Sequence, residues 1–339
     1  MKKILLINGS PRKGNCSIIL KKIEEKFNGE EISVETIELR KLKLNYCNGC
    51  HKYCEFTGKC SQNDGINELL PKLLECDMLI IASPNYFQNV TGLTKTFFDR
   101  TSPLYHKRLL RGKKLFFIFV GALDTKITTD TVIPCANGWA RPMKFYWINN
   151  YVFQATDINK FMDSDFDEKM QNLLNEIDER INEKVVLSEL TSSFDENIYD
   201  MFQDIEKEEN GFINDFYGLN KEEYLLQLKN QLDESIRNNT KTYILKINDV
   251  AVGVGRIAIK DNQSQVEDVI EYAIAKKYRG KLYGNYLFEN LLKECVKLNY
   301  SELIQSTNKN NVKNLKVLKK FGNVVDSNND VYKVKFILK

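Results

Sequence analysis

Four of the chain's eight cysteines lie within one short stretch, "NYCNGCHKYCEFTGKC", residues 45–60. Cys47, Cys50, Cys54 and Cys60 are separated by two, three and five residues. Thiols so arranged can form disulfides, bind zinc, hold an iron–sulfur cluster or bind nothing. The spacing is too compressed for two zinc knuckles, which normally lie roughly a dozen or more residues apart, and it favours a cluster over zinc.

Length and composition narrow these alternatives. The 339 residues suffice for two domains, each with its own core, so no disulfide framework is needed. The apolar run of residues 4–7 is far shorter than a signal sequence or a membrane span, so we expect a cytoplasmic protein with reduced thiols and no membrane partner. The net charge of +3, with lysines alternating with glutamates, argues against a nucleic-acid partner.

Short apolar runs alternate with amphipathic stretches in the first half of the chain. This pattern predicts a parallel sheet covered by helices on both faces, a doubly wound α/β domain that ends near residue 183. The expected strands are residues 2–8, 32–39, 77–84, 113–122 and 149–155, and the expected helices are residues 16–27, 66–76, 93–100, a segment within 129–147, and 165–184.

The second half has a different pattern, which predicts a mixed α+β domain over residues 186–339. We expect strands around an Asn248-Asp249 turn. The other expected elements are a strand at 185–190, two acidic helices within 195–237, a strand at 266–274, a helix ending near Leu298, a strand at 301–306 and a helix ending near Phe321.

Two loops of the first domain could bind a ligand. Residues 9–17 connect a strand to a helix, where unpaired N–H groups favour an anion, and Ser10, Arg12, Asn15 and Ser17 add polar side chains. The loop is neither a GxGxxG nor a Walker sequence. An ordinary serine-capped turn is the alternative. In the second loop, residues 83–92, aromatic side chains could stack on a planar ring or belong to the core.

Taken together, "GSPRKGNCS", the cysteine segment, Asp64, "SPNYFQNVTGLTKTFFDR" and "GKKLFFIFVGA" resemble the NAD(P)H-dependent FMN reductase and iron–sulfur flavoprotein family, over roughly the first 120 residues. The resemblance implies a flavodoxin-like fold, FMN and NAD(P)H. As partners we expect a small-molecule electron acceptor and a second copy of the chain in a homodimer. The resemblance assigns Ser10, Arg12, Asn15 and Ser17 to the FMN phosphate, and Pro84, Asn85, Tyr86, Phe87, Gly121 and Ala122 to the isoalloxazine. Cys16 stands where relatives have Thr or Ser.

The cysteine segment departs from the cluster-bearing members of this family. Those members have two residues, not three, between the second and third cysteines, and other members keep a similar loop without a cluster. A 4Fe–4S cluster or zinc held by Cys47, Cys50, Cys54 and Cys60 and a metal-free loop therefore stay open, and we favour the metal-free loop. Cys76, Cys135 and Cys295 lie in apolar surroundings and are expected to be packing residues.

The segments "IEYAIAKKYRGKLYGNYLFENLLKECVKLNY" and "IQSTNKNNVKNLKVLKKFGNVV" resemble the GNAT N-acyltransferases. The resemblance implies a bulged strand whose N–H groups at Ile274, Ala275 and Lys276 hold the acetyl carbonyl of acetyl-CoA. It assigns Arg279, Gly280, Lys281, Tyr283 and Gly284 to the pyrophosphate and Asn311 to the pantetheine arm.

Two positions depart from the GNAT pattern, because Leu282 replaces a glycine of the turn and Leu318 stands where many members have a tyrosine acid. Asp268 or Glu271 could act as the base towards an unknown amine, and strand parity places these two on opposite faces. Either could equally be a solvated surface carboxylate.

The chain is thus expected to be a bifunctional enzyme, an FMN-dependent NAD(P)H oxidoreductase fused to an N-acetyltransferase. In one alternative, the second domain is a non-catalytic module that binds acyl-CoA or a partner. In another, the first domain is an electron-transfer protein.

Overall fold

The chain forms two compact units, Met1–Asn182 and Glu183–Lys339, which we describe separately. In this computed structural model the described residues are 1–106, 109–145, 147–191, 193, 195–205, 216, 218–237, 239–259, 266–280, 283–327 and 330–338. Within these ranges, no helix is both long enough and apolar enough to cross a lipid bilayer.

The first unit is a twisted sheet in the order β2-β1-β3-β4-β5-β6. The first five of these strands are parallel, and short β6 pairs antiparallel with β5. This is the flavodoxin-like doubly wound order, so the expected fold class is confirmed. The strands are β1 (Lys2–Asn8), β2 (Ile32–Glu38), β3 (Met78–Pro84), β4 (Lys114–Gly121), β5 (Trp147–Asp157) and β6 (Lys160–Phe161).

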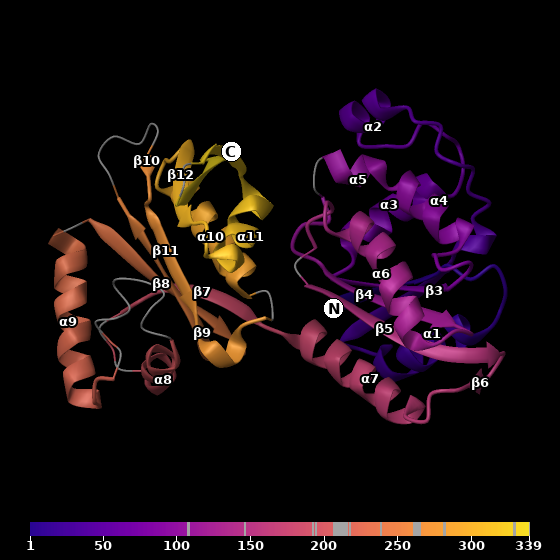
Figure 1. Ribbon diagram of the computed structural model, residues 1–339, viewed down its shortest axis with the longest axis horizontal. Helices are drawn as coiled ribbons and strands as arrows, with labels where there is room; N and C mark the ends of the chain where they lie inside the picture. Colours follow the sequence, from indigo (N-terminus) through magenta and orange to yellow (C-terminus); the bar gives the residue numbers. More distant parts are fainter. Residues whose placement is uncertain are drawn as a thin grey trace. The chain divides into compact units, whose positions relative to one another are not determined.

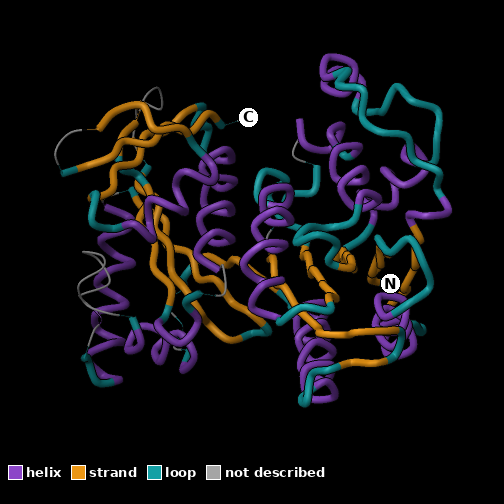
Figure 2. The backbone as a smooth tube through the Cα atoms, turned by 45° about the vertical axis from the view of Figure 1, so that its right-hand side comes forward, coloured by secondary structure: helices purple, strands orange, loops and turns teal. Residues whose placement is uncertain are grey.

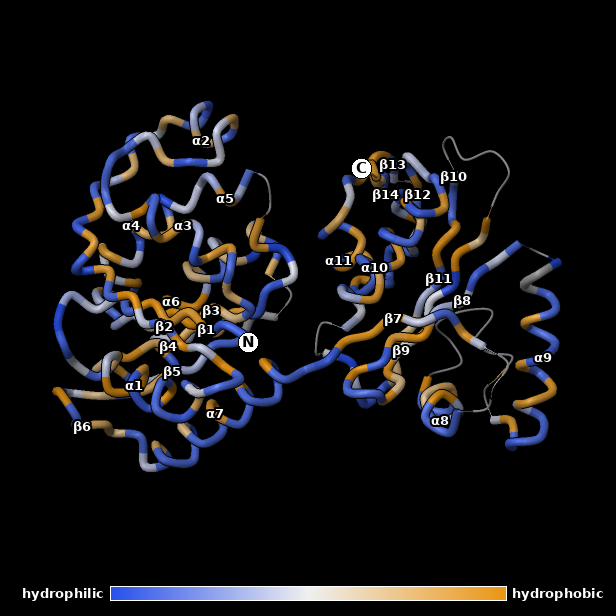
Figure 3. The backbone as a smooth tube through the Cα atoms, turned by 180° about the vertical axis from the view of Figure 1, so that it is seen from behind, coloured by the Kyte–Doolittle hydropathy of each residue, from blue (hydrophilic) through white to orange (hydrophobic). Residues whose placement is uncertain are grey.

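Helices cover both faces of this sheet (Figures 1 and 2). Along β1, Ile4 and Leu6 pack with α1 and α7, while Leu5 and Ile7 pack with α3, α4 and α6. Because both faces are buried, the central strands are apolar throughout rather than alternating (Figure 3). The helices are α1 (Asn15–Phe27), α2 (His51–Thr57), α3 (Ile66–Glu75), α4 (Gly92–Arg100), α5 (Ser102–His106), α6 (Thr125–Ala140) and α7 (Phe166–Asn182), with a 3-10 turn η1 at Leu39–Lys41.

Three helices of the first unit, α2, α5 and α6, differ from the sequence expectation, and the short helix α5 was not expected at all. Helix α6 begins at Thr125 rather than within 129–147, because the Asp124 side chain accepts a hydrogen bond from Lys126 N and caps the helix. Helix α2 in the cysteine segment was not expected from the sequence. It has only seven residues and ends at Gly58, whose φ of 67° is easily adopted by glycine.

The second unit contains two four-stranded sheets, β11-β9-β8-β7 and β10-β12-β14-β13. Its strands are β7 (Val185–Glu189), β8 (Thr240–Ile247), β9 (Val250–Ala258), β10 (Val266–Glu267), β11 (Ile270–Ile274), β12 (Glu302–Asn308), β13 (Asn323–Ser327) and β14 (Val331–Ile337). Its helices are α8 (Glu196–Asp204), α9 (Lys221–Arg237), α10 (Tyr283–Lys297) and α11 (Val312–Phe321), with a 3-10 turn η3 at Lys276–Tyr278.

The strand expected at 266–274 is two strands in different sheets. Residues before Asp268 pair with β12 and residues after Val269 pair with β9. Asp268 has a φ of 51°, which turns the chain from one sheet to the other. The argument that strand parity separates Asp268 from Glu271 therefore fails, since Asp268 lies outside both strands. The expected Asn248-Asp249 turn is present, with φ of 50° and 65° as in a type I′ turn.

Candidate functional site

A hollow of about 150 Å³ lies at the carboxyl edge of the first sheet. Strands β1, β3, β4 and β5 all end there, beside the point between β1 and β3 where the strand order reverses. In doubly wound sheets this is the position where ligands bind. The residues that line the hollow are Ser10, Arg12, Gly14, Asn15, Cys16, Pro84, Asn85, Tyr86, Val120, Gly121, Ala122, Ala155, Thr156 and Ile158.

Ser10 fixes the shape of the loop that follows β1. Its buried hydroxyl donates to Arg12 O at 2.8 Å and accepts from Arg12 N at 3.3 Å, while Ser10 N donates to Asn8 Oδ1. The Arg12 side chain is exposed at the rim of the hollow. Arg12 is therefore placed to meet an anion, whereas the Ser10 side chain mainly holds the backbone.

Asn15 and Ser17 are engaged with the rest of the fold. The Asn15 amide donates to Asp157 O at 2.8 Å and accepts from Asn159 N at 2.7 Å, which ties the first turn of α1 to the turn between β5 and β6. Ser17 Oγ accepts from Asn8 Nδ2 at 2.9 Å, and Ser17 is not among the residues that line the hollow. Of the two, only Asn15 borders the expected phosphate position.

Cys16 packs into the core beneath this loop. The residue is 3% exposed, and burial raises the pKa of its thiol to about 12. The thiol is therefore protonated at neutral pH and adds no charge to the loop.

Asn85 lines the hollow and carries a buried acceptor atom. Its backbone N donates to Val120 O at 2.8 Å, and its Nδ2 donates to the Thr128 hydroxyl at 3.0 Å. Its Oδ1 is buried and has no hydrogen-bond partner in the described part of the chain. An acceptor left in this way is costly unless a ligand supplies the donor.

Tyr86 and Phe87 begin a tight two-residue turn. Tyr86 and Asn89 exchange backbone hydrogen bonds of 2.9 and 3.1 Å around Phe87 and Gln88, whose φ values are 51° and 61°. Tyr86 borders the hollow, but the Phe87 side chain is fully exposed and does not line it. The expectation that both rings line a flavin therefore fits Tyr86 only.

Sequence reasoning missed the far wall of the hollow, which Ala155, Thr156 and Ile158 form at the end of β5. The strand itself was expected at residues 149–155. Because the carboxyl ends of parallel strands share one edge, the residues that follow it could have been added to the site by the same rule that selected the other loops.

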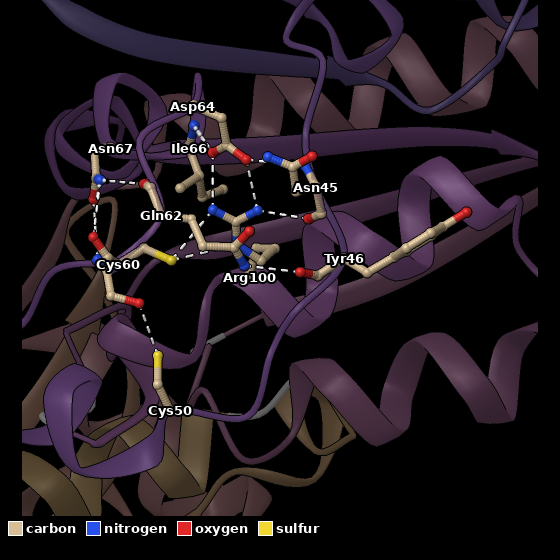
Figure 4. A network of polar contacts seen from close by, with 10 residues as sticks. Asn45, Tyr46, Cys50, Cys60, Gln62, Asp64, Ile66, Asn67 and Arg100 are labelled. Atoms are coloured by element: carbon tan, nitrogen blue, oxygen red, sulfur yellow. Dashed lines mark hydrogen bonds and ion pairs between the residues drawn. The ribbon is translucent and has the colours of Figure 1, made fainter.

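The cysteine segment is anchored by one buried ion pair (Figure 4). The Arg100 guanidinium donates to both oxygens of Asp64, at 2.8 Å each, and to Asn45 O. It also donates through Nε and Nη2 to Cys60 Sγ, at 3.3 and 3.2 Å. Burial alone would raise the pKa of Asp64, but hydrogen bonds from Arg100, Asn45 N and Ile66 N lower it below its ordinary value.

The four thiols as placed do not form a metal-ligand set. Cys47 is exposed, Cys50 is half-buried, and Cys54 and Cys60 are buried. In the described ranges no three His, Cys, Asp or Glu side chains converge to hold a metal ion. Burial and neighbouring thiols raise the pKa of Cys54 to about 11, while the Ser61 hydroxyl, 3.1 Å from Cys50 Sγ, lowers the pKa of Cys50. Four thiols suit iron–sulfur chemistry, but this arrangement does not fit a cluster without rearrangement of the segment.

In the second unit, one expected acetyl-CoA contact lies on the side of β11 that faces away from β9, where no strand of the described residues pairs with it. Ala275 N donates to Val252 O on β9 at 2.9 Å, so the amide of neighbouring Ile274 points away from β9. Arg279 Nε donates to Ile274 O on that same side, at 3.0 Å. The Ile274 N–H is thus directed away from β9, whereas Ala275 uses its N–H within the sheet. Strand β11 pairs with β9 without a bulge; the register shift in this sheet lies between β8 and β9.

The other expected acetyl-CoA residues follow β11. Lys276 begins η3, Gly280 has a φ of 79°, and Tyr283 and Gly284 start α10. The Tyr283 hydroxyl is buried and donates to Glu183 at 2.7 Å, so only its backbone is left for a pyrophosphate. Asn311 caps α11 by accepting from Asn314 N at 3.0 Å. Lys281 and Leu282 lie outside the described residues.

Both candidate catalytic carboxylates have protein partners. Asp268 Oδ1 accepts from Ser306 N at 2.5 Å and from Gln305 Nε2 at 3.1 Å. Glu271 forms an ion pair with Arg256 across β11 and β9, with the closest approach at 2.6 Å. Leu318 is fully buried. Each carboxylate is thus already hydrogen-bonded or ion-paired within the protein, and neither is a free base in this structure.

Two family models match separate regions of the chain. Residues 2–132 match NADPH-dependent FMN reductase, and residues 198–322 match the acetyltransferase (GNAT) family. These matches confirm both resemblances stated from the sequence. The chain therefore carries an FMN-reductase-type region followed by a GNAT-type region.

Individual relatives match the first region. An iron–sulfur flavoprotein of Archaeoglobus fulgidus is 41% identical over 112 residues, 33% of this chain and 50% of that protein. One of Methanocaldococcus jannaschii is 37% identical over 121 residues, 35% of this chain and 62% of that protein. One of Clostridioides difficile is 33% identical over 114 residues, 32% of this chain and 49% of that protein. This chain thus spans between 49% and 62% of the length of these relatives.

Proposed function

We propose that the first unit binds FMN and acts as an NAD(P)H-dependent oxidoreductase towards a small-molecule acceptor. The observation that carries this proposal is the hollow at the β1/β3 switch point, lined in part by Asn85, whose buried Oδ1 has no partner among the described residues. FMN, when bound, accepts a hydride from a nicotinamide and passes electrons on.

The residues around the hollow have separate tasks in this proposal. Arg12 and the N–H groups at the start of α1 hold the phosphate, and the Ser10 and Asn15 hydrogen bonds keep that loop in shape. Asn85 accepts a donor of the flavin ring, and Tyr86 covers the ring. The orientation of the ring by these contacts is the protein's contribution to catalysis, and no acid–base pair is required.

Titration of the purified full-length chain with FMN tests this assignment. Quenching of flavin fluorescence gives the affinity, and NADH and NADPH oxidation with quinone or flavin acceptors gives the activity. Arg12→Ala should weaken FMN binding by about 1.5–3 kcal/mol, or roughly 10- to 150-fold, because a charged hydrogen bond is lost. Lys13→Ala is the matched control, since Lys13 is exposed but does not border the hollow. Equal binding by both variants, or no binding by the wild type, would contradict the proposal.

For the second unit we propose acetyl transfer from acetyl-CoA to an amine, with the Ile274 N–H towards the acetyl carbonyl and Asp268 or Glu271 as the base. The alternative, a module that binds acyl-CoA or a partner without catalysis, is favoured by the engagement of both carboxylates. Calorimetry with acetyl-CoA, followed by a thiol-release assay with a panel of amines, separates these functions. Binding without release by any amine supports the module, and release supports the enzyme.

A further inference from the structure

The spacing that sets this chain apart places two thiols one helical turn from each other. Cys50 is the N-cap of α2 and Cys54 lies four residues later, with Cys54 N bonded to Cys50 O. Helix geometry puts Cα atoms four residues apart at about 6 Å, within the range of roughly 4.4–6.8 Å that disulfides span. Their Cβ atoms lie about 5–6 Å apart, so a bond requires the first turn of α2 to close by about 1 Å or more.

The two thiols differ in access. Cys54 is 4% exposed, whereas Cys50 is half-buried and has the Ser61 hydroxyl 3.1 Å from its sulfur. A small molecule can therefore reach Cys50 first, and Cys54 can then be reached from Cys50.

Cys60, the next cysteine along the chain, is held by groups outside this pair. Cys60 Sγ accepts two hydrogen bonds from buried Arg100, and its backbone N and O are both bonded to Asn67. Asn45 is held by Asp64 and Arg100 at the other end of the segment (Figure 4). The segment is thus anchored at both ends, and its middle carries Cys50 and Cys54.

We propose that Cys50 and Cys54 form a dithiol–disulfide site whose substrates are small-molecule disulfides. Cys50 attacks one sulfur of the substrate, whose S–S bond breaks, and the first thiol leaves with the Cys50 proton. Cys54 then attacks the Cys50 sulfur in the mixed disulfide, and the second thiol leaves with the Cys54 proton. Overall the two protein thiols are oxidised to one S–S bond, and the external disulfide is reduced to two thiols.

The full-length chain, purified anaerobically and reduced, tests this proposal with oxidised glutathione as the probe. We expect the loss of two titratable thiols per chain and their recovery with a dithiol reductant. Trypsin cleaves after Lys52, so the bond should join the peptides of residues 44–52 and 53–59. Cys47→Ser and Cys135→Ser, as controls, should keep this linked pair.

The single variants separate the two steps of the exchange. Cys50→Ser should abolish the linkage, while Cys54→Ser should stop at a stable adduct of one glutathione on residue 50. Circular dichroism of each variant checks that it is folded. No thiol loss in the wild type, a bond through Cys60, or iron and sulfide bound by the wild type and absent from Cys50→Ser would overturn the proposal.

Discussion

Arg100 and Asp64 form a two-pronged ion pair in the interior of the first unit, with both N···O distances at 2.8 Å and side chains 0% and 7% exposed. The pair joins Arg100, at the end of helix α4, to Asp64, which lies between α2 and α3. These two residues are far apart in the sequence. Because a buried ion pair recovers its desolvation cost only when all its hydrogen bonds are made, removal of one partner is expected to cost more than removal of both.

Arg100→Ala should therefore destabilise the first unit by about 3–5 kcal/mol, since Asp64 would remain buried and uncompensated. Both tryptophans, Trp139 and Trp147, lie in the first unit, so tryptophan fluorescence during urea unfolding reports on this unit alone. The double variant Arg100→Met/Asp64→Leu serves as the control and should lose less stability. An equal loss in the single and double variants would show that the ion pair is not what Arg100 contributes.

The same pair predicts a pH dependence. The folded pKa of Asp64 is below its ordinary value of about 3.9, so its stabilising contribution is complete at neutral pH and is lost as the pH falls from about 5 through the folded pKa. Asp64→Asn should be less stable than the wild type at pH 7. The difference in unfolding free energy should shrink with acidification, because the two proteins have all other carboxylates in common and their titration cancels. A difference that stays constant from about pH 3 to pH 7 would contradict the assignment.

Gly9 is required by close packing beneath the hollow. A Cβ there would lie 1.9 Å from Thr94 Oγ1 and 3.1 Å from Ala82 O, so Gly9→Ala should destabilise the first unit by about 1–3 kcal/mol and weaken FMN binding. Gly29→Ala is the matched control, because a Cβ at Gly29 meets no atom within 4 Å. Tryptophan fluorescence and flavin titration measure both effects, and equal stability of the two variants would be the adverse result.

Variants at Asn85 and at its partner Thr128 test whether the Asn85 Oδ1 atom meets the flavin. Asn85→Ala removes the buried Oδ1 and should weaken FMN binding by about 1–3 kcal/mol. Thr128→Val removes the partner of Nδ2 but leaves Oδ1 in place, so it should weaken binding less. Flavin fluorescence titration measures both variants, and a larger loss in Thr128→Val would show that Oδ1 does not meet the ligand.

The first sheet could be predicted from the sequence because its strands are buried on both faces. Runs such as Met78–Pro84 and Lys114–Gly121 are apolar for that reason, and their carboxyl ends mark the site. The roles of individual polar side chains could not be predicted. The Asn15 side chain is hydrogen-bonded to the backbone of Asp157 and Asn159, which lie more than a hundred residues away. Only the folded chain brings these partners together.

The second unit shows the same limit at the backbone level. Residues 266–274 have the composition of one strand, and nothing local marks Asp268 as the position where the chain leaves one sheet for another. That break depends on Ser306 and Gln305, which lie on β12. Strands β13 and β14, which follow the last expected helix, were likewise not identified from the sequence.

Asp268 should be sensitive to alanine and tolerant of asparagine. Asparagine keeps an acceptor oxygen for Ser306 N and adopts a φ of 51° readily, so Asp268→Asn should change stability little. Asp268→Ala loses this acceptor and pays about 1–2 kcal/mol for the left-handed backbone. Hydrogen–deuterium exchange of the peptide that contains Glu302–Asn308 should therefore accelerate in Asp268→Ala and stay near the wild-type rate in Asp268→Asn. If both variants exchange alike, Asp268 does not hold β12, and its carboxylate is left for the proposed role as a base.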